Sequence, residues 1–549
     1  MATKSQPFAP GVAELTGLTL AAAVFALIIA ATLGSWLGLN PGWPAIASAT
    51  LATGGGLLAW GRHARQFPTA LKALATAIAL TVFSIWLALQ YLDLGTDGYM
   101  YQLPAVISLA NGWSPFSGVV PVFPAYTINY AILHYPHGWW LAQAALYNAS
   151  HNIETIKALS ILLAWAAALV WWGWLARGQS TSGKIWITLG IAALTLNPVF
   201  VYQVATNYAD APAASALLIV LALGLQALHN PTKTRWLLLG AALALVPHIK
   251  FTGLIYGLIL FALLGILHLL HTFRSGWRTV LPGIALMAGL TVSVFGIGAS
   301  SYGMNLLTHA NPVYPVLTPQ GASIIADMAP ANFNPLPAWN KTLRSWFASA
   351  VVSPPTGFTP DYLPPLKIPF SVTQADITAS GCYAAALRFG GFGPWFSGVL
   401  LLSLPLLFLT ARRAWNQKTG CNHPATALPF IAIVLLALPL LAGWGWWARQ
   451  YPLAWWVPLL PALACLAWPA GKTHTRLLAC ALILTALVNT LLLAAFSQPC
   501  QLMQAQAFKQ LVATLSLYKQ TLAIPNLNDG NFIVQRRLLD AGIPVVVQP

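Results

Sequence analysis

Charged side chains are scarce in this sequence, and acidic ones are the scarcest. Asp, Glu, Lys and Arg together make up 7% of the 549 residues, and only ten residues are acidic. A soluble domain carries about 25% charged residues, so the composition excludes an ordinary soluble protein. Hydrophobic residues reach 58%, and the mean hydropathy is +0.70. Because a helix satisfies its own backbone hydrogen bonds in lipid and crosses ~30 Å of hydrocarbon with roughly 20 residues, we predict an all-α polytopic membrane protein.

Three other features are missing. The N-terminus lacks the short apolar region and cleavage site of a signal peptide, so we expect the first apolar run to be a retained helix. The basic residues behind the net charge of +16 are spread in twos and threes between apolar runs, which argues against a nucleic-acid partner and for the lipid bilayer. No Cys and His residues have the spacing of a zinc site. No metal site is predicted, while a need for a divalent cation such as Mg or Mn stays open.

Apolar runs predict about thirteen transmembrane helices within a domain over residues 1–497. This domain carries two large outer loops, 93–154 and 301–393, with interfacial helices, and a small periplasmic tail, 498–549, follows it. The expected spans are 15–38, 43–60, 71–92, 155–176, 185–205, 212–229, 236–247, 249–271, 279–300, 394–411, 426–443, 454–470 and 476–497.

The basic residues predict the orientation of these spans. With the N-terminus in the cytoplasm, more than half of the 26 Lys and Arg residues fall in inner loops, and nine of the ten acids fall outside or at outer helix ends. We therefore expect a multi-pass protein of the bacterial inner membrane with a periplasmic C-terminus. Cys382 and Cys500 both fall outside, where disulfides persist, so a bridge between them is a hypothesis.

The loop 93–154 carries two acids close together and no Lys or Arg. Asp93 and Asp97 follow the end of a span, and residues 99–110 are expected to form an interfacial helix that ends at Gly112. A purely structural role also fits, because Asp often caps helices. Two features favour function instead: acids are rare in this chain, and the loop is rich in the Tyr, Trp and Pro residues that can form the wall of a pocket.

Short motifs along residues 70–470 resemble, in order, those of a known family. The first, D-G-Y-M-Y-Q-L-P from Asp97, matches the family's D-x-x-x-Y-H-L-P, except that Gln102 replaces the His. The later motifs N-Y-A-D-A-P, H-I-K-F-T, N-P-V-Y-P and R-Q-Y-P begin at Asn207, His248, Asn311 and Arg449. The chain therefore resembles the GT-C superfamily of polyprenyl-phosphate-sugar-dependent glycosyltransferases, in particular the bacterial members related to protein mannosyltransferases. Two extra helices before the matching part depart from the commonest arrangement.

The resemblance implies an inverting glycosyltransferase that moves a sugar from a polyprenyl-phosphate donor to a periplasmic glycan, lipid or protein acceptor. Such a transfer needs a base for the acceptor proton, and Asp97 is the first candidate and Asp93 the second. A cation beside the departing phosphate stabilises the transition state. Arg449 and Lys250 are the donor-phosphate candidates, because each lies beside a span near the outer face and Arg offers a bidentate fork.

Most of these residues also have a structural explanation. Arg449 fits an interfacial anchor among Trp residues. Lys250 fits a side chain that snorkels or pairs with Asp210, which in turn fits a helix cap. Two His alone make a poor metal site. The substrate-binding candidates are Tyr101, Gln102, Asp210, His134 and His137.

Two other kinds of function stay open. An O-antigen-type polymerase or ligase would share the architecture but would rely on Arg and His in a late outer loop. A transporter or flippase for lipid-linked glycans would place ionisable residues near the membrane midplane and would often repeat its fold. The break at Pro247 fits a transporter, while the lack of a visible repeat argues against one. The sequence does not specify the sugar, the lipid carrier, the acceptor or the oligomeric state.

Overall fold

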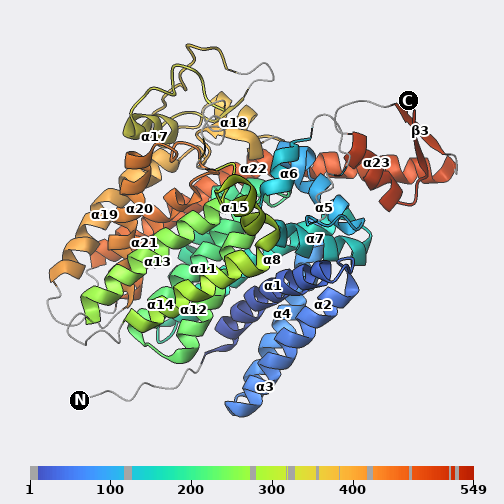
Figure 1. The fold of residues 1–549 in the computed structure, drawn as a ribbon. Helices are drawn as coiled ribbons and strands as arrows, with labels where there is room; N and C mark the ends of the chain where they lie inside the picture. Colours follow the sequence, from blue (N-terminus) through green and yellow to red (C-terminus); the bar gives the residue numbers. More distant parts are fainter. Residues whose placement is uncertain are drawn as a thin grey trace.

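The protein is mostly helical, as a computed structural model shows (Figure 1). Eight of its described helices are long and apolar enough to cross a membrane, or nine if one bent pair counts as a span. The eight are α1 (Val12–Trp36), α4 (Phe67–Ala88), α8 (Ala158–Leu175) together with η3 (Ile153–Lys157), α11 (Asp210–His229), α13 (Phe251–Thr272), α19 (Phe396–Asn416), α20 (Leu428–Ala442) together with η10 (Pro424–Ala427), and α22 (Thr473–Tyr518). The structure describes residues 10–116, 121, 127–272, 280–316, 318, 328–353, 358–382, 384–416, 424–468, 473–518, 521–525 and 531–548.

The prediction of thirteen spans was wrong, because four expected spans are shorter or interrupted helices. Asn197 separates two of these helices: its side chain accepts the Phe200 N–H at 2.9 Å, and Pro198 begins the next helix. Hydropathy counts apolar residues and does not detect such breaks. The segments concerned are α2 (Trp43–Thr50), η1 (Leu51–Gly55) and α3 (Gly56–His63); α9 (Thr181–Thr195) and α10 (Pro198–Gln203); α12 (Lys233–Leu245) and η4 (Val246–His248); η11 (Pro452–Trp455) and α21 (Trp456–Ala467).

The bent pair replaces the span expected at 279–300. The chain turns by 77° near Gly298, where an added Cβ atom would collide with the Val294 carbonyl oxygen. Because only glycine fits this close approach, the second half runs in a new direction toward the loops. The pair consists of α14 (Leu281–Val292), η7 (Ser293–Ile297), η8 (Ala299–Gly303) and α15 (Met304–His309).

The helix bundle has a buried centre and an apolar exterior. Helices α11 and α21 are buried on nearly all sides, which agrees with their lack of a polar face. Outer helices expose large apolar side chains, such as Ile78, Val82 and Trp86 on α4 and Ile266 and Leu270 on α13. Soluble proteins rarely expose such continuous apolar surface. The arrangement is that of a multi-pass membrane protein.

The loops between helices build a second layer at one end of the bundle. Figure 1 shows α6, α15, α17 and α18 together at this end, away from α3. The layer contains η2 (Gly98–Gln102), α5 (Leu103–Ala110), α6 (Asn129–His134), α7 (His137–Ser150), η3 (Ile153–Lys157), α17 (Ala338–Trp346), α18 (Gln374–Ala379) and η9 (Ala384–Ala386), while η10 (Pro424–Ala427) precedes α20.

The helix expected at 99–110 is present as η2 and α5, and Gly112 follows it with a φ of +90°. Most side chains of α5 are buried, and the helix packs against α7. It is therefore part of the protein interior and not the interfacial helix that we expected on the membrane surface.

The described residues also form two small β-sheets, so the chain is mostly helical and not all-α as predicted. Strands β1 (Val351–Val352) and β2 (Leu387–Phe389) pair antiparallel within the long second loop. Strands β3 (Leu522–Pro525) and β4 (Val545–Gln548) pair parallel around α23 (Asn531–Asp540), so the C-terminal segment forms a β-α-β unit. The β-branched Val residues of these strands favour the extended conformation. Helix α22 continues past residue 497, so the expected domain boundary falls inside one helix.

A disulfide links the second loop to α22. It joins Cys382 and Cys500, whose Cα atoms are 5.3 Å apart. The bridge that the sequence offered as a hypothesis is therefore present in the structure. It fixes the segment that carries η9 and β2 beside the start of the loop that follows α4.

Candidate functional site

Asp93 organises the loop that follows α4. Its carboxylate is fully buried and accepts the backbone N–H groups of Gly95 and Asn207, each at 2.8 Å. Burial, and after it the charge of Glu154, raises the pKa of Asp93 from 3.8 to about 6. Asp93 is not among the described residues that line the cavity discussed below. The structure thus places the second candidate base where it holds two chain segments together.

Two glycines allow the backbone to pass close to Asp93. A Cβ atom at Gly98 would collide with the Asp93 carboxylate, and a Cβ atom at Gly95 would collide with the ring of Tyr208. The sequence D-L-G-T-D-G therefore folds into a tight turn. This turn presents Asp97 immediately before η2.

The structure brings Asp97 and Arg449 together across 352 positions of sequence. Arg449 Nη2 donates a hydrogen bond to Asp97 Oδ2, and Arg449 Nη1 lies 3.4 Å from Oδ1. Tyr101 donates its hydroxyl to Asp97 Oδ2 at 2.8 Å, and the Asp97 backbone N–H donates to the Tyr208 hydroxyl at 3.3 Å. The Asp97 side chain keeps 18% exposure. A carboxylate held in this way has a fixed direction and is still open to a small molecule.

Arg449 lies at the centre of the site on an aromatic platform. Its guanidinium carbon is 4.5 Å from the centroid of Tyr208 and 4.9 Å from that of Trp447. Its Nε is 3.3 Å from Asp210 Oδ2, close enough for an ion pair although not aligned as a hydrogen bond. Burial alone would lower the pKa of Arg449, but Asp97 and Asp210 together raise it well above the ordinary value. The guanidinium is therefore charged at every physiological pH.

A second ion pair adjoins the first. Lys250, between η4 and α13, donates to Asp210 Oδ1, and its Nζ is 3.4 Å from Gln450 Oε1. Asp210, at the start of α11, also accepts Gln203 Nε2 at 2.8 Å. The pairing with Asp210 is the structural explanation that the sequence offered for Lys250. It also brings a second cation within the same cluster as Arg449.

These four charges line one small cavity. It measures about 20 Å³, which is room for about one water molecule. Tyr101 and Gln102 also line it, and Trp140 Nε1 donates a hydrogen bond to Gln102 Oε1. Six of the nine candidate residues thus meet: Asp97, Tyr101, Gln102, Asp210, Lys250 and Arg449. The cluster carries two negative and two positive charges, so the ions neutralise one another.

The two candidate His residues lie elsewhere. His134 Nδ1 is 2.8 Å from Asn305 Oδ1, and His137 has its ring nitrogens 3.1 Å from Ser300 Oγ and 2.9 Å from the Ile132 carbonyl. Burial lowers the pKa of His137 from 6.5 to about 4. Neither His is among the described residues that line the cavity. Their contacts instead attach α6 and α7 to the bent pair.

The described part of the chain contains no group of three or more His, Cys, Asp or Glu residues that could hold a metal ion. The carboxylates of Asp97 and Asp210 both use their oxygens to accept bonds from cations. Both cations that line the cavity, Arg449 and Lys250, are thus paired with these two carboxylates.

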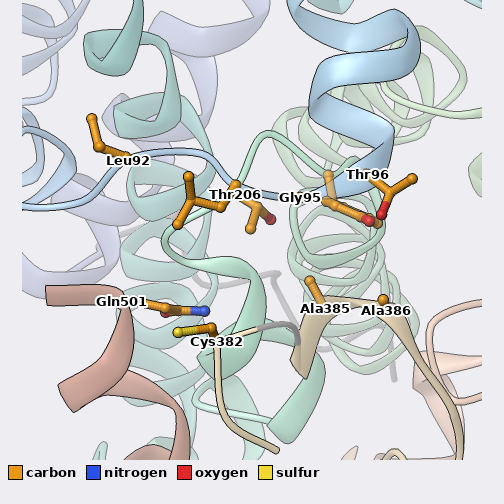
Figure 2. A pocket seen from close by; sticks show the side chains of 10 residues that line it. Leu92, Gly95, Thr96, Thr206, Cys382, Ala385, Ala386 and Gln501 are labelled. Atoms are coloured by element: carbon orange, nitrogen blue, oxygen red, sulfur yellow. The ribbon is translucent and has the colours of Figure 1, made fainter. Parts of the chain in front are cut away.

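A second small pocket lies beside the turn that presents Asp97. Figure 2 shows Gly95 and Thr96 on one side of it and Ala385, Ala386 and Cys382 on the other. Tyr208 and Gln501 of α22 also line it. The η9–β2 segment is thus packed directly against the loop of the candidate site.

Several contributing residues were not identified from the sequence. Tyr208 and Trp447, which support Arg449, sit inside motifs that we had singled out, N-Y-A-D-A-P and the Trp-rich stretch before R-Q-Y-P. Their position beside the charged residues Asp210 and Arg449 in these motifs was the signal that could have identified them. Arg388, which stacks on Trp447, and Arg537, which donates to the Asp93 carbonyl and the Tyr99 hydroxyl, lie far away in sequence and carry no local signature.

Comparison with known proteins adds no constraint. No protein-family model matches the chain, and no curated protein is similar enough to be matched. The case for a function therefore rests on the geometry of the cavity.

Proposed function

We propose that this protein is a membrane glycosyltransferase that moves a sugar from a polyprenyl-phosphate donor to the hydroxyl of a glycan, lipid or protein acceptor, with inversion. The observation that carries the proposal is the meeting of Asp97 with Arg449 at one cavity, beside Lys250 and Asp210. A carboxylate aimed at a cation-lined cavity provides what the reaction needs: a base for the acceptor and charge stabilisation for the leaving phosphate.

In this mechanism the acceptor hydroxyl attacks the anomeric carbon of the donor sugar. Asp97 takes the hydroxyl proton, the new glycosidic bond forms, and the bond from the anomeric carbon to the phosphate oxygen breaks. The electron pair of that bond stays on the polyprenyl phosphate, whose added negative charge Arg449 and Lys250 stabilise. Tyr101, which donates a hydrogen bond to Asp97, keeps the carboxylate in one orientation.

Substrate entry requires the ion pairs to rearrange. The cavity holds about one water molecule while Arg449 and Asp97 are paired. A donor phosphate that takes over the guanidinium would release the Asp97 carboxylate toward the acceptor. Asp97 would thus stay paired with Arg449 until the donor binds, and only then would its carboxylate be free to act as a base.

The proposal also includes a GT-C-like architecture and an orientation. Helix α3 lies at the end of the bundle opposite the loop layer (Figure 1), carries Arg62 in its last turn and is followed by Arg65. By the positive-inside rule this end faces the cytoplasm, and the cavity opens on the periplasmic side of the inner membrane. Lipid-linked donors reach such a site from the outer leaflet.

The test is transfer of radiolabelled sugar from a panel of undecaprenyl-phosphate sugars in proteoliposomes that contain membrane-extracted acceptors. Asp97→Asn should lower the rate at least 100-fold without changing elution or thermal unfolding. Asp361→Asn, which changes an exposed acid away from the cavity, is the matched control. Equal rates in Asp97→Asn and wild type would reject Asp97 as the base. Movement of labelled lipid-linked glycan across the bilayer without new glycosidic bonds would favour a flippase, and growth of long glycan chains would favour a polymerase.

A further inference from the structure

A third cation lies beside the site, on the same indole as Arg449. Arg388 belongs to β2, and its guanidinium carbon is 4.3 Å from the centroid of Trp447, while that of Arg449 is 4.9 Å from the same centroid. Trp447 is fixed in place, because its Nε1 donates to the Leu387 carbonyl at 2.8 Å. The two guanidinium carbons are therefore no more than about 9 Å apart, the sum of the two distances.

Arg388 differs from the other cations of the site in its partners. Arg449 is paired with two carboxylates and Lys250 with one. Arg388 has no carboxylate within ion-pair distance among the residues that the structure describes; its Nη2 donates to Met328 Sδ at 3.1 Å, and its buried Nε has no hydrogen-bond partner. A half-buried guanidinium whose Nε is buried without a partner is costly to the fold. A bound anion would offset that cost.

The surroundings of Arg388 connect it electrostatically to the site. Burial, and after it the positive charge of Arg449, lowers the pKa of Arg388 from 12.5 to about 10, and Asp97 acts in the opposite direction. Arg388 therefore remains charged at neutral pH. Figure 2 shows Ala385 and Ala386, just before β2, facing the turn that presents Asp97.

We infer that Arg388 is a further ligand of the donor phosphate. This inference rests on the proposed function. One phosphate that accepts hydrogen bonds from two guanidinium groups holds their carbons roughly 8 Å apart, within the limit set by the shared indole. The two guanidinium groups are therefore close enough to contact the same phosphate.

The charge balance agrees with the monophosphate donor of the proposed function. Asp97, Asp210, Arg449 and Lys250 cancel, so Arg388 leaves the described cluster with one positive charge. A sugar phosphodiester carries one negative charge. On transfer, Asp97 takes the acceptor proton and the cluster gains one positive charge, while the polyprenyl phosphate leaves as a monoester with a second negative charge. The net charge of the cluster therefore balances that of the sugar phosphodiester before the reaction and that of the polyprenyl phosphate after it. A diphosphate donor would carry more negative charge than the cluster balances.

The experiment measures binding of undecaprenyl phosphate to the full-length protein in nanodiscs, by native mass spectrometry. Arg388→Gln should weaken binding about tenfold or more, and Arg388→Lys should weaken it less, because it keeps the charge. Arg344→Gln is the matched control, since Arg344 lies on α17 and its Nε donates to Asn340 Oδ1. Undecaprenyl diphosphate should bind more weakly than the monophosphate.

Two results would overturn the inference. The first is equal affinity of wild type and Arg388→Gln for undecaprenyl phosphate, in samples with matching thermal unfolding. The second is tighter binding of the diphosphate.

Asp327→Asn tests the competing explanation that Arg388 pairs with this carboxylate, because Asp327 precedes Met328 in sequence and lies outside the described residues. Destabilisation by Asp327→Asn as large as that by Arg388→Gln, with binding retained in both, would identify an ion pair instead. Arg388-dependent binding without sugar transfer would reject the proposed function and leave the phosphate site standing.

Discussion

Arg537 and Glu154 form a buried ion pair, with 2.6 Å between Arg537 Nη2 and Glu154 Oε1. Their positions are 383 residues apart in the sequence. Arg537 also donates to the Asp93 carbonyl and to the Tyr99 hydroxyl, each at 2.7 Å. Asp93 and Tyr99 flank Asp97 in the loop of the candidate site. The C-terminal helix α23 is thus attached to both sides of the turn that presents the proposed base.

We expect Arg537→Gln to destabilise the protein and to slow sugar transfer. Removing the guanidinium leaves the carboxylate of Glu154 buried with Lys157 as its remaining charged partner, a change that typically costs about 3–5 kcal/mol. Because the turn around Asp97 would loosen, kcat should fall more than the donor KM rises. The measurements are thermal unfolding and steady-state kinetics.

Arg536→Gln is the control for this prediction. Arg536 is the neighbouring residue, but it is 32% exposed and contacts Asp540 and the Tyr147 side chain of α7 instead of Asp93 and Tyr99. A similar loss of kcat in Arg536→Gln would mean that any disturbance of α23 has this effect. A normal kcat in Arg537→Gln would show that the contacts with Asp93 and Tyr99 do not position Asp97.

Arg449→Lys should raise the donor KM about tenfold and lower kcat, although it keeps the charge. Lysine loses the bidentate fork that contacts both oxygens of Asp97, and it loses the stacking on Tyr208 and Trp447. Steady-state kinetics with varied donor at fixed acceptor would measure both constants. Arg412→Lys, at the exposed end of α19, should leave them unchanged. Unaltered kinetics in Arg449→Lys would mean that a point charge suffices and that the fork has no role.

Much of the candidate site was accessible from the sequence. The scarcity of acids singled out Asp97 together with Asp93, because an ionised group in an apolar sequence needs a partner or a function. Motifs that resemble those of a known family added Asp210, Lys250 and Arg449. The pairings themselves could not be predicted in full. The Asp97–Arg449 and Arg537–Glu154 contacts join positions more than 350 residues apart, and nothing local in the sequence encodes them.

Three expectations from the sequence were wrong or incomplete for a related reason: apolar content alone does not show where helices break or which helices cover one another. Hydropathy predicted thirteen spans, because it cannot distinguish one long helix from two short helices separated by Asn197 and Pro198. The helix at 99–110 was expected on the membrane surface, but α7 covers it. The contacts of His134 and His137 with the bent pair depend on the turn near Gly298, which an apolar run does not reveal.

Acid should weaken the fold through His137. Burial lowers its pKa to about 4 from 6.5, so the unfolded chain takes up a proton as the pH falls below 6.5 while the folded protein does not. The free energy of unfolding is therefore complete above pH 6.5 and is lost progressively between pH 6.5 and 4. At pH 5 the loss from this group is about 2 kcal/mol. Thermal unfolding at pH 7 and pH 5 measures it.

His137→Gln should flatten this pH dependence, since glutamine keeps hydrogen-bonding groups but does not titrate. His134, whose pKa burial also lowers, is less buried, so His134→Gln should flatten it less. A pH dependence that is the same in His137→Gln and in wild type would assign the acid sensitivity to other groups.

An apolar loop tip lies between β1 and α18. Ile368 is 78% exposed, and Phe370 and Val372 are also exposed. The base of the tip is fixed, because Lys367 Nζ donates to both carboxylate oxygens of Asp376 at 2.8 Å. Three large apolar side chains in water would be unfavourable. We therefore expect the tip to insert into the lipid beside the bundle.

The neighbouring span supports this expectation. The ring of Phe370 lies 5.9 Å from that of Trp395 and covers Gly398 near the start of α19. Ile368→Cys, labelled with an NBD fluorophore in a background without Cys421, Cys465 and Cys480, should emit at shorter wavelength in proteoliposomes and be quenched by nitroxide lipids. Asp361→Cys should show neither effect, because Asp361 is an exposed acid nearby in the same loop. If the label at Ile368→Cys emits at the same wavelength as the label at Asp361→Cys, the tip faces water and does not insert into lipid.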